Sequence, residues 1–195
     1  MPTQDQWVVV GLDNGGNTNN ATVLEPSGTF LVDSMVETPS RVLEGAEIAV
    51  DCLAAAFDDI LKRTGVARER VRAVGFDSPG PASADGVVSS RGSTNFAHET
   101  WRNFDYRGAL EKRLGLPTVY NNDGNAAALY AHFQHYGSDG RGRSSVAAIV
   151  GTGLGGGVIE KGHIVKGANG FAGELGHVHI PMDGLLAEGQ PVPLC

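Results

Sequence analysis

A glycine-rich segment at residues 151–157 constrains the fold of this chain more than any other feature. It follows an apolar run, Val146 to Val150, that is typical of a buried strand. Gly151, Gly153 and Gly156 fit the G-x-G-x-x-G pattern of dinucleotide-binding loops, which requires a helix directly after the glycines. The next residues instead form two short β-branched segments around a Gly turn, which is typical of a hairpin. The pattern therefore predicts a strand, a tight glycine loop and a returning strand. Backbone N–H groups in such a loop can approach a phosphate because no Cβ intervenes.

The same arrangement occurs near the start of the chain. An apolar run from Trp7 to Leu12 leads into a polar glycine loop at 13–20, a second strand at Ala21 to Leu24 and a third at Thr29 to Val32. A unit that recurs once, about 140 residues later, predicts two similar halves facing each other, because a solenoid needs several short repeats. Two opposed glycine hairpins could hold the phosphates of one nucleotide. The alternative is two ordinary hairpins with no shared function.

Composition narrows the class of protein. The 195 residues are 41% hydrophobic, which is enough for one or two domains with a sizeable core. The net charge of −7 provides no basic surface for nucleic acid or for an anionic membrane. We recognise no signal peptide and no apolar run of membrane-spanning length. With only two cysteines, Cys52 and Cys195, we expect a protein of the reducing cytoplasm.

Helices and strands are predicted to alternate between the two glycine loops. Apolar periodicity indicates helices at 44–64, 106–114 and 126–136 and buried strands at 71–76 and 116–120. The polar, glycine-rich residues 138–144 indicate the boundary between two domains, 1–137 and 138–195.

Asp123 lies between a predicted strand and a predicted helix. In open α/β sheets, ligands bind at such junctions. Asp and Asn are also common helix N-caps, so Asp123 or Asn122 could serve only to cap the helix. Spacing alone favours neither interpretation.

Five segments, taken together and in order, resemble the ROK family of sugar kinases and repressors. They are GLDNGGNTNNATVLEPSG, DSPGP, NNDGNAAAL, GTGLGGG and GELGH. The first and fourth are similar to the family's phosphate loops, the second to its sugar-side loop, the third to its catalytic segment, and the last to its sugar-binding and zinc-associated motif. The third is particularly similar to bacterial glucokinases and N-acylmannosamine kinases. The resemblance implies an α/β fold of the actin and hexokinase type, with two ribonuclease-H-like domains, the second incomplete in this chain.

The resemblance also implies roles for individual residues. Asp123 matches the catalytic base that accepts a proton from the sugar hydroxyl. The residues that match sugar-binding positions are Gly80, Asn122, Asp123, Glu174 and His177, and those that match phosphate-binding positions are Asp13, Gly15, Gly16, Asn17, Thr18, Thr152 and Gly153. The first loop departs from the family pattern at Asn17-Thr18, where the hydroxyl is shifted by one position. The implied cofactor is ATP with Mg²⁺, which neutralises phosphate charge during transfer.

The GELGH segment also implies a structural Zn²⁺ site. His177 matches a zinc ligand, and Cys195 would be the first of the cysteine ligands that follow it. The interval between the two is longer than is usual in the family, and no further cysteine follows, so this chain cannot complete the site. The alternative is that His177 and His179 are one packed and one exposed histidine.

These features predict an ATP-dependent kinase of a hexose, an amino sugar or a related polyol. We expect it to bind sugar and nucleotide but neither nucleic acid nor membrane, and to form a homodimer or a higher homo-oligomer when full length. One alternative is a ROK transcriptional regulator, which would carry a helix-turn-helix before the first loop, where only six residues precede Trp7. Another is a sugar-binding pseudokinase, suggested by the altered first loop. The sequence leaves open which sugar is used and whether the donor is ATP or polyphosphate.

Overall fold

The computed structural model describes residues 7–80, 82–88, 95–151 and 153–178. They divide into two compact units, residues 7–123 with 168–170 and residues 124–167 with 171–178. The predicted boundary between residues 137 and 138 separates two folding domains. The division into compact units does not test whether each domain folds independently, so this boundary stays a prediction. No helix in the described ranges combines the length and apolarity needed to cross a membrane.

The first unit is built on a five-stranded sheet with strand order β3-β2-β1-β4-β7. Its strands are β1 (Val8–Asn14), β2 (Thr18–Leu24), β3 (Val36–Pro39), β4 (Val71–Ser78) and β7 (Thr118–Asn122). β1 pairs antiparallel with β2 but parallel with β4, and β4 pairs parallel with β7. The carboxyl ends of β1, β4 and β7 therefore lie at the same edge of the sheet.

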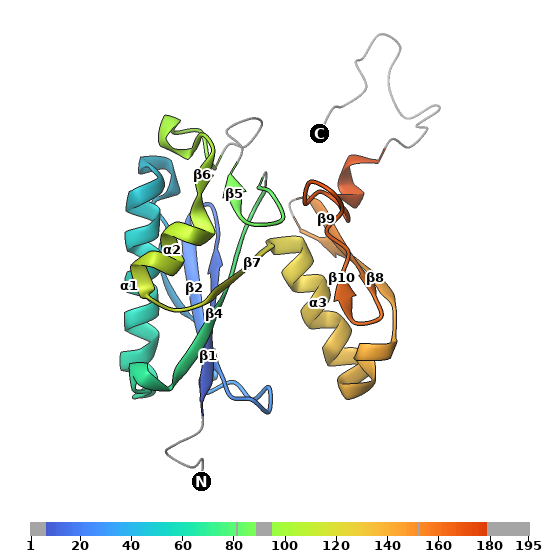
Figure 1. Ribbon diagram of the computed structural model, residues 1–195, viewed down its shortest axis with the longest axis horizontal. Helices are drawn as coiled ribbons and strands as arrows, with labels where there is room; N and C mark the ends of the chain where they lie inside the picture. Colours follow the sequence, from blue (N-terminus) through green and yellow to red (C-terminus); the bar gives the residue numbers. More distant parts are fainter. Residues whose placement is uncertain (1–6, 81, 89–94, 152, 179–195) are drawn as a thin grey trace. The chain divides into compact units, whose positions relative to one another are not determined.

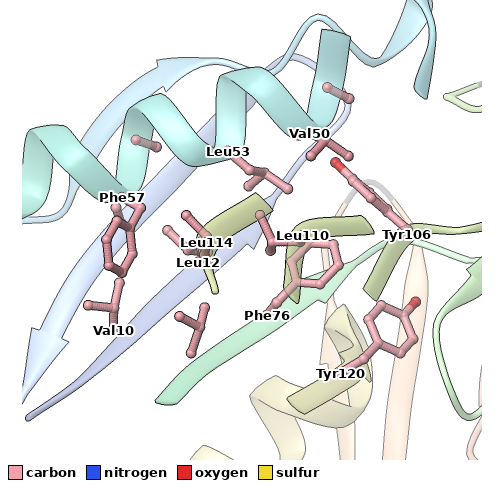
Figure 2. Packing of buried hydrophobic residues seen from close by; sticks show 14 of the residues in the cluster. Val10, Leu12, Val50, Leu53, Phe57, Phe76, Tyr106, Leu110, Leu114 and Tyr120 are labelled. Carbon is pink, nitrogen blue, oxygen red and sulfur yellow. The ribbon is translucent and has the colours of Figure 1, made fainter. Parts of the chain in front are cut away.

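Helices α1 (Ala46–Thr64) and α2 (Tyr106–Leu114) cover one face of this sheet (Figure 1). Successive residues of a strand point to opposite faces, and in β1 the buried set includes Val10 and Leu12. Figure 2 shows Leu53 and Phe57 of α1 directed at these two side chains. Each such side chain contributes about 1.5–3 kcal/mol when fully buried. The helix-covered face is therefore the core, and the opposite face carries the remaining residues of β1.

A side-chain cap and two glycines define the limits of these helices. The N–H of Gly108 donates to Asp105 Oδ1 at 2.8 Å, so Asp105 caps α2. Gly65 and Gly115, with φ of 67° and 66°, terminate α1 and α2 in the left-handed region that favours glycine. The helices predicted at 44–64 and 106–114 are confirmed, although a 3₁₀ turn, η1 (Val42–Glu44), replaces the start of the first.

Short elements complete the first unit. They are η2 (Arg68–Arg70), β5 (Val87–Val88), η3 (Glu99–Trp101) and β6 (Phe104–Asp105). Trp101 is fully buried, and its indole Nε1–H donates to the carbonyl of Val42 at 2.8 Å. This hydrogen bond ties η3 to the turn that precedes α1.

The second unit contains a three-stranded antiparallel sheet of order β10-β9-β8. Its strands are β8 (Ser145–Val150), β9 (Leu154–Glu160) and β10 (His163–Ile164), accompanied by α3 (Asp123–Tyr136), η4 (Gly137–Gly142) and η5 (Leu175–His177). The first residue of α3, Asp123, belongs to the first unit. Buried His132 of α3 bonds Ser145 Oγ through Nδ1 at 2.7 Å and donates from Nε2 to the Gly140 carbonyl at 2.9 Å. It thereby joins α3 to η4 and β8.

Both glycine hairpins are confirmed. β1 and β2 pair antiparallel around residues 15–17, and β8 and β9 pair antiparallel around residues 151–153. Gly155 and Gly156 lie within β9 rather than in a helix, which rules out the dinucleotide-binding interpretation. That the two hairpins superpose stays a prediction.

Several details of the predicted elements are wrong. The third strand is Val36–Pro39 rather than Thr29 to Val32, because the chain after β2 makes only one bridge, Leu24 to Phe30, before it leaves the sheet. The run from Val146 to Val150 is a strand but not a buried one: Val146 and Val150 are 66% and 82% exposed, because no described residue covers that face of β8.

A further detail is that β4 and β7 continue two residues beyond the predicted ends at Phe76 and Tyr120. Parallel pairing of Asp77 with Asn121 and of Ser78 with Asn122 keeps these polar residues in the sheet. Likewise, α3 begins at Asp123, three residues before its predicted start. The strand therefore passes directly into the helix.

Candidate active site

A row of four polar residues crosses the first sheet near its carboxyl edge. Asn20, Asp13, Asp77 and Asn121 are successive partners on β2, β1, β4 and β7. Paired residues on neighbouring strands point to the same face. Leu12, the residue before Asp13, is 2% exposed in the core. The polar row therefore lies on the face opposite α1 and α2.

Asp13 accepts a hydrogen bond from its neighbour in this row. Asn20 Nδ2 donates to Asp13 Oδ2 at 2.9 Å. Asp77 is the Cα partner of Asp13 on β4, and the two carboxyl groups are close enough to interact. Asn121 Oδ1, next to Asp77 in the row, is buried and has no hydrogen-bond partner among the described residues. The row is thus rich in oxygen acceptors.

The electrostatics of the row centre on Asp77. Burial first, then the negative charge of Asp13, the hydrogen bond to Asp13 and the charge of Asp123 raise the pKa of Asp77 to about 8. Burial likewise raises the pKa of Tyr120 to about 12, with smaller contributions from the charges of Asp123 and Asp77. Asp13 and Asp123 therefore both act on Asp77 at the carboxyl edge of the sheet.

Asp123 has the position that the sequence predicts, between a strand and a helix. It follows the last residue of β7 directly, begins α3, and is exposed. Asn122 precedes it, and a Cβ added at Gly80 would lie 3.7 Å from Asn122 Nδ2. The structure therefore brings Gly80 and Asn122, two predicted sugar-side residues, next to each other beside Asp123.

The first glycine loop is a tight turn between β1 and β2. The N–H of Gly15 donates to the Thr18 carbonyl at 2.8 Å. A Cβ at Gly15 would lie 2.9 Å from that carbonyl oxygen, so the turn requires glycine there. At its base, buried Asn14 Nδ2 donates to Asn19 Oδ1 at 2.6 Å. The loop residues predicted to hold phosphate, Gly15, Gly16, Asn17 and Thr18, lie in this turn next to Asp13, and their contact with phosphate stays a prediction.

The second loop is less constrained. The N–H of Gly151 donates to the Gly153 carbonyl at 2.9 Å, and both glycines are exposed. Among the described residues, no atom lies within 4 Å of the position that a Cβ would take on either glycine. Thr152, the other predicted phosphate-binding residue of this loop, lies outside the described residues. The two described glycines of this turn therefore leave room for the close approach of a phosphate.

Glu174 and His177 lie in the second unit beside β9. His177 Nε2 is 3.8 Å from Glu174 Oε2, and η5 begins after Glu174. A Cβ at Gly156 would lie 2.7 Å from Leu175 Cδ1, so the glycine in β9 permits this close approach. The structure brings Glu174 and His177 together. That they join Asp123 in one sugar site stays a prediction.

The predicted metal sites are not supported by the described residues. Within them, no group of three or more His, Cys, Asp or Glu side chains is placed to hold a metal ion. Cys195, the second proposed zinc ligand, lies outside the described residues. We therefore derive no chemistry through zinc.

The sequence does not single out Asp77. Its partnership with Asp13 depends on the register between two parallel strands, which local pattern cannot specify. The available signal is its position: like Asp123, Asp77 follows an apolar run predicted to be a strand.

In comparisons with known proteins, most of the chain matches a single protein family. Residues 9–192 match the model of the ROK family. A glucokinase of Halalkalibacterium halodurans is 32% identical over 184 residues, which is 92% of this chain and 52% of the relative. The ROK hexokinase from Thermus thermophilus has a TM-score of 0.72 and 35% identity, covering 89% of this chain and 54% of that one. The ROK family glucokinase from Streptomyces griseus, solved in complex with glucose and AMPPNP, has a TM-score of 0.69 and 30% identity, covering 92% of this chain and 53% of that one.

These similarities show the mixed α/β, actin and hexokinase type of fold. The chain spans about half the length of the relatives it matches. Regulators are among them, since a xylose repressor of Bacillus subtilis is 25% identical over 175 residues, 90% of this chain and 43% of the repressor.

Proposed function

This chain belongs to the ROK family, and from that premise we propose that the full-length protein transfers the terminal phosphoryl group of ATP to a sugar hydroxyl. The observation that carries the proposal is that Asp13 and Asp123 both act on Asp77 at the carboxyl edge of β1, β4 and β7. The glycine turn that follows Asp13 lies at the same edge. A carboxylate that can accept a proton thus lies near a loop whose backbone N–H groups can approach phosphate.

Asp123 is the proposed base. Phosphoryl transfer has a loose transition state, so catalysis depends mainly on orienting the hydroxyl and on neutralising charge. Asp123 is exposed at the start of α3, where its carboxylate can accept a hydrogen bond from the hydroxyl and take the proton as the new P–O bond forms. Adjacent Asn122 and Gly80 would contact the sugar from the first unit.

Glu174 and His177 are the proposed sugar-binding residues of the second unit. Glu174 accepts hydrogen bonds, and an imidazole can donate or accept one, so the pair can bind two hydroxyl groups of a sugar. Their separation of 3.8 Å allows neighbouring hydroxyls to be held at once.

ATP-dependent transfer also requires a divalent cation, which lowers the charge of the phosphates when bound. Mg²⁺ is often held by substrate phosphates with only one or two carboxylates. Because the described residues contain no ready group of three ligands, we assign it no protein ligand and no step.

The test is sugar-dependent turnover by the full-length protein. ADP release would be measured with glucose, N-acetylglucosamine, N-acetylmannosamine and xylose, and without sugar as the blank. We expect at least one sugar to stimulate ADP release and to yield a phosphorylated product by mass spectrometry. Calorimetric binding of a sugar without any turnover would overturn the kinase proposal in favour of a regulator or a pseudokinase.

A further inference from the structure

Asp13 and Asp77 present two carboxyl groups side by side. They are Cα partners on the parallel strands β1 and β4, and both point to the face opposite the helices. Neighbouring strands lie about 4.8 Å apart. Their carboxyl groups are close enough to interact, and a hydrogen bond between two carboxyl groups requires that one of them carries a proton.

The surroundings decide which group carries that proton. Asp13 already accepts a hydrogen bond from Asn20 Nδ2 at 2.9 Å, so it acts as an acceptor. Asp77 receives no N–H donor within the described residues. The titratable groups that act on it are Asp13 on β1 and Asp123 at the start of α3, and Tyr120 on β7 is coupled to it. All of these are acidic groups, so none offers a positive charge that would favour an ionised Asp77.

We propose that Asp77 is a positioning residue that keeps its proton at neutral pH and donates it to the Asp13 carboxylate, which it holds in place beside the first glycine turn. The proposal rests on the kinase function proposed above, because we assign to Asp13 and the glycine turn the role of receiving the phosphates of a nucleotide.

A neutral Asp77 has two consequences for nucleotide binding. It fixes the orientation of Asp13, and it keeps one negative charge away from the place where phosphates would bind. Burial and the neighbouring carboxylates raise the pKa of Asp77 to about 8. Above this pH the proton leaves, the hydrogen bond to Asp13 is lost, and a new negative charge repels the phosphates. The KM for ATP should therefore rise on the alkaline side, whereas kcat should change less.

The kinetic test compares full-length wild-type protein with Asp77→Asn and Asp77→Ala. The amide of Asn can donate to Asp13 at every pH and never ionises. For a single group with a pKa of about 8, the wild-type KM for ATP should rise about tenfold between about pH 7 and pH 9. Asp77→Asn should keep a near-wild-type KM at neutral pH and lose most of this rise. Asp77→Ala, which has no donor, should have a raised KM at all pH values.

Asp33→Asn is the matched control, because Asp33 is exposed in the loop between β2 and β3. It should retain the wild-type pH profile. If Asp77→Asn also retains the full alkaline rise, another group is responsible and the proposal is wrong. Should Asp77→Ala fail to fold, the comparison of Asp77→Asn with Asp33→Asn still decides the matter.

A second measurement does not depend on activity. Carboxyl ¹³C NMR of aspartate-labelled full-length protein, assigned by the resonance missing in Asp77→Asn, should show Asp77 titrating at about pH 8. Titration at the ordinary value of about 3.9 would overturn the inference. If Asp77 titrates at about pH 8 but no sugar supports turnover, the kinase proposal fails while the protonated Asp77 stands, so the two failures are distinguishable.

Discussion

The two glycine hairpins share a sequence pattern but differ in what surrounds them. In the first, β1 lies between β2 and β4, and its residues Val8, Val10 and Leu12 are at most 2% exposed beneath α1. In the second, β8 is an edge strand among the described residues, and Val146 and Val150 are 66% and 82% exposed. An apolar run followed by glycines thus predicts a strand and a turn, but not the layer that covers the strand.

The hairpins also differ in the groups that they bring to the turn. The turn of the first hairpin follows Asp13, which belongs to a row of polar residues across four strands. The second contains only small and apolar residues on either side of its turn, from Ile149 to Gly155 except for Thr152. If both hold phosphate, the first does so with a carboxylate nearby and the second mainly through its backbone.

The largest effect is expected for Asp123→Asn. The amide keeps the shape and much of the capping ability, so folding should survive. Loss of the base should lower kcat by about 10²-fold or more, with little change in sugar affinity. Kinetics of the full-length protein would be measured beside thermal unfolding, with Asp33→Asn as the control. A near-normal kcat would show that Asp123 only caps α3, a role worth about 0.5–2 kcal/mol of stability.

Glu174→Gln tests the contribution of the second unit to sugar binding. An amide replaces a charged acceptor by a weaker one, so we expect the KM for sugar to rise about tenfold, more than kcat falls. The measurement is initial rates over a range of sugar concentrations at saturating ATP. An equal fall in kcat and kcat/KM would instead show that Glu174 interacts with the sugar only in the transition state.

Replacing Gly15 and Gly153 by alanine tests whether the two turns differ in the space available for a side chain. A Cβ at Gly15 would lie 2.9 Å from the Thr18 carbonyl oxygen, whereas no described atom lies near one at Gly153. Gly15→Ala should therefore reduce stability by about 1–3 kcal/mol, and Gly153→Ala should leave it unchanged. If the second turn binds phosphate through its backbone, Gly153→Ala should still raise the KM for ATP severalfold. Equal melting temperatures for both variants would contradict the structural difference between the turns.

Over any single pH unit, the dependence of stability on pH should be the smallest of these effects. Because the pKa of Asp77 is raised on folding to about 8, the folded state binds more protons than the unfolded state above about pH 4. The free energy of unfolding should thus fall as pH rises toward 8 and then level off, by at most about 1.4 kcal/mol per pH unit. Denaturant unfolding of wild type and Asp77→Asn at several pH values measures this. A stability difference between the two that does not change with pH would contradict it.

Local sequence patterns predict much of the fold. The turn glycines mark both hairpins, Gly65 and Gly115 mark helix ends, and Asp105 caps α2, because each depends on residues close in the chain. The third strand shows the limit of such patterns. They predict it at Thr29 to Val32, whereas it is Val36–Pro39, since edge pairing depends on tertiary contacts rather than on β-propensity.

The candidate site is predicted only in part. Asp123 and the first turn are recognisable from their positions next to apolar runs. Asp77 is not, because its link to Asp13 arises from the register of β1 and β4, which lie far apart in the sequence. The extension of β4 and β7 to Ser78 and Asn122 depends on the same kind of pairing. The register between strands that lie far apart in the sequence is thus what local sequence patterns do not predict.

The most direct test of the central claim is a crystal structure of the full-length protein with its sugar and a non-hydrolysable ATP analogue. We predict that an Asp123 carboxylate oxygen lies about 2.6–3.2 Å from one sugar hydroxyl. That hydroxyl should face the terminal phosphate of the analogue. A sugar bound away from Asp123, or a hydroxyl directed away from the terminal phosphate, would contradict the account.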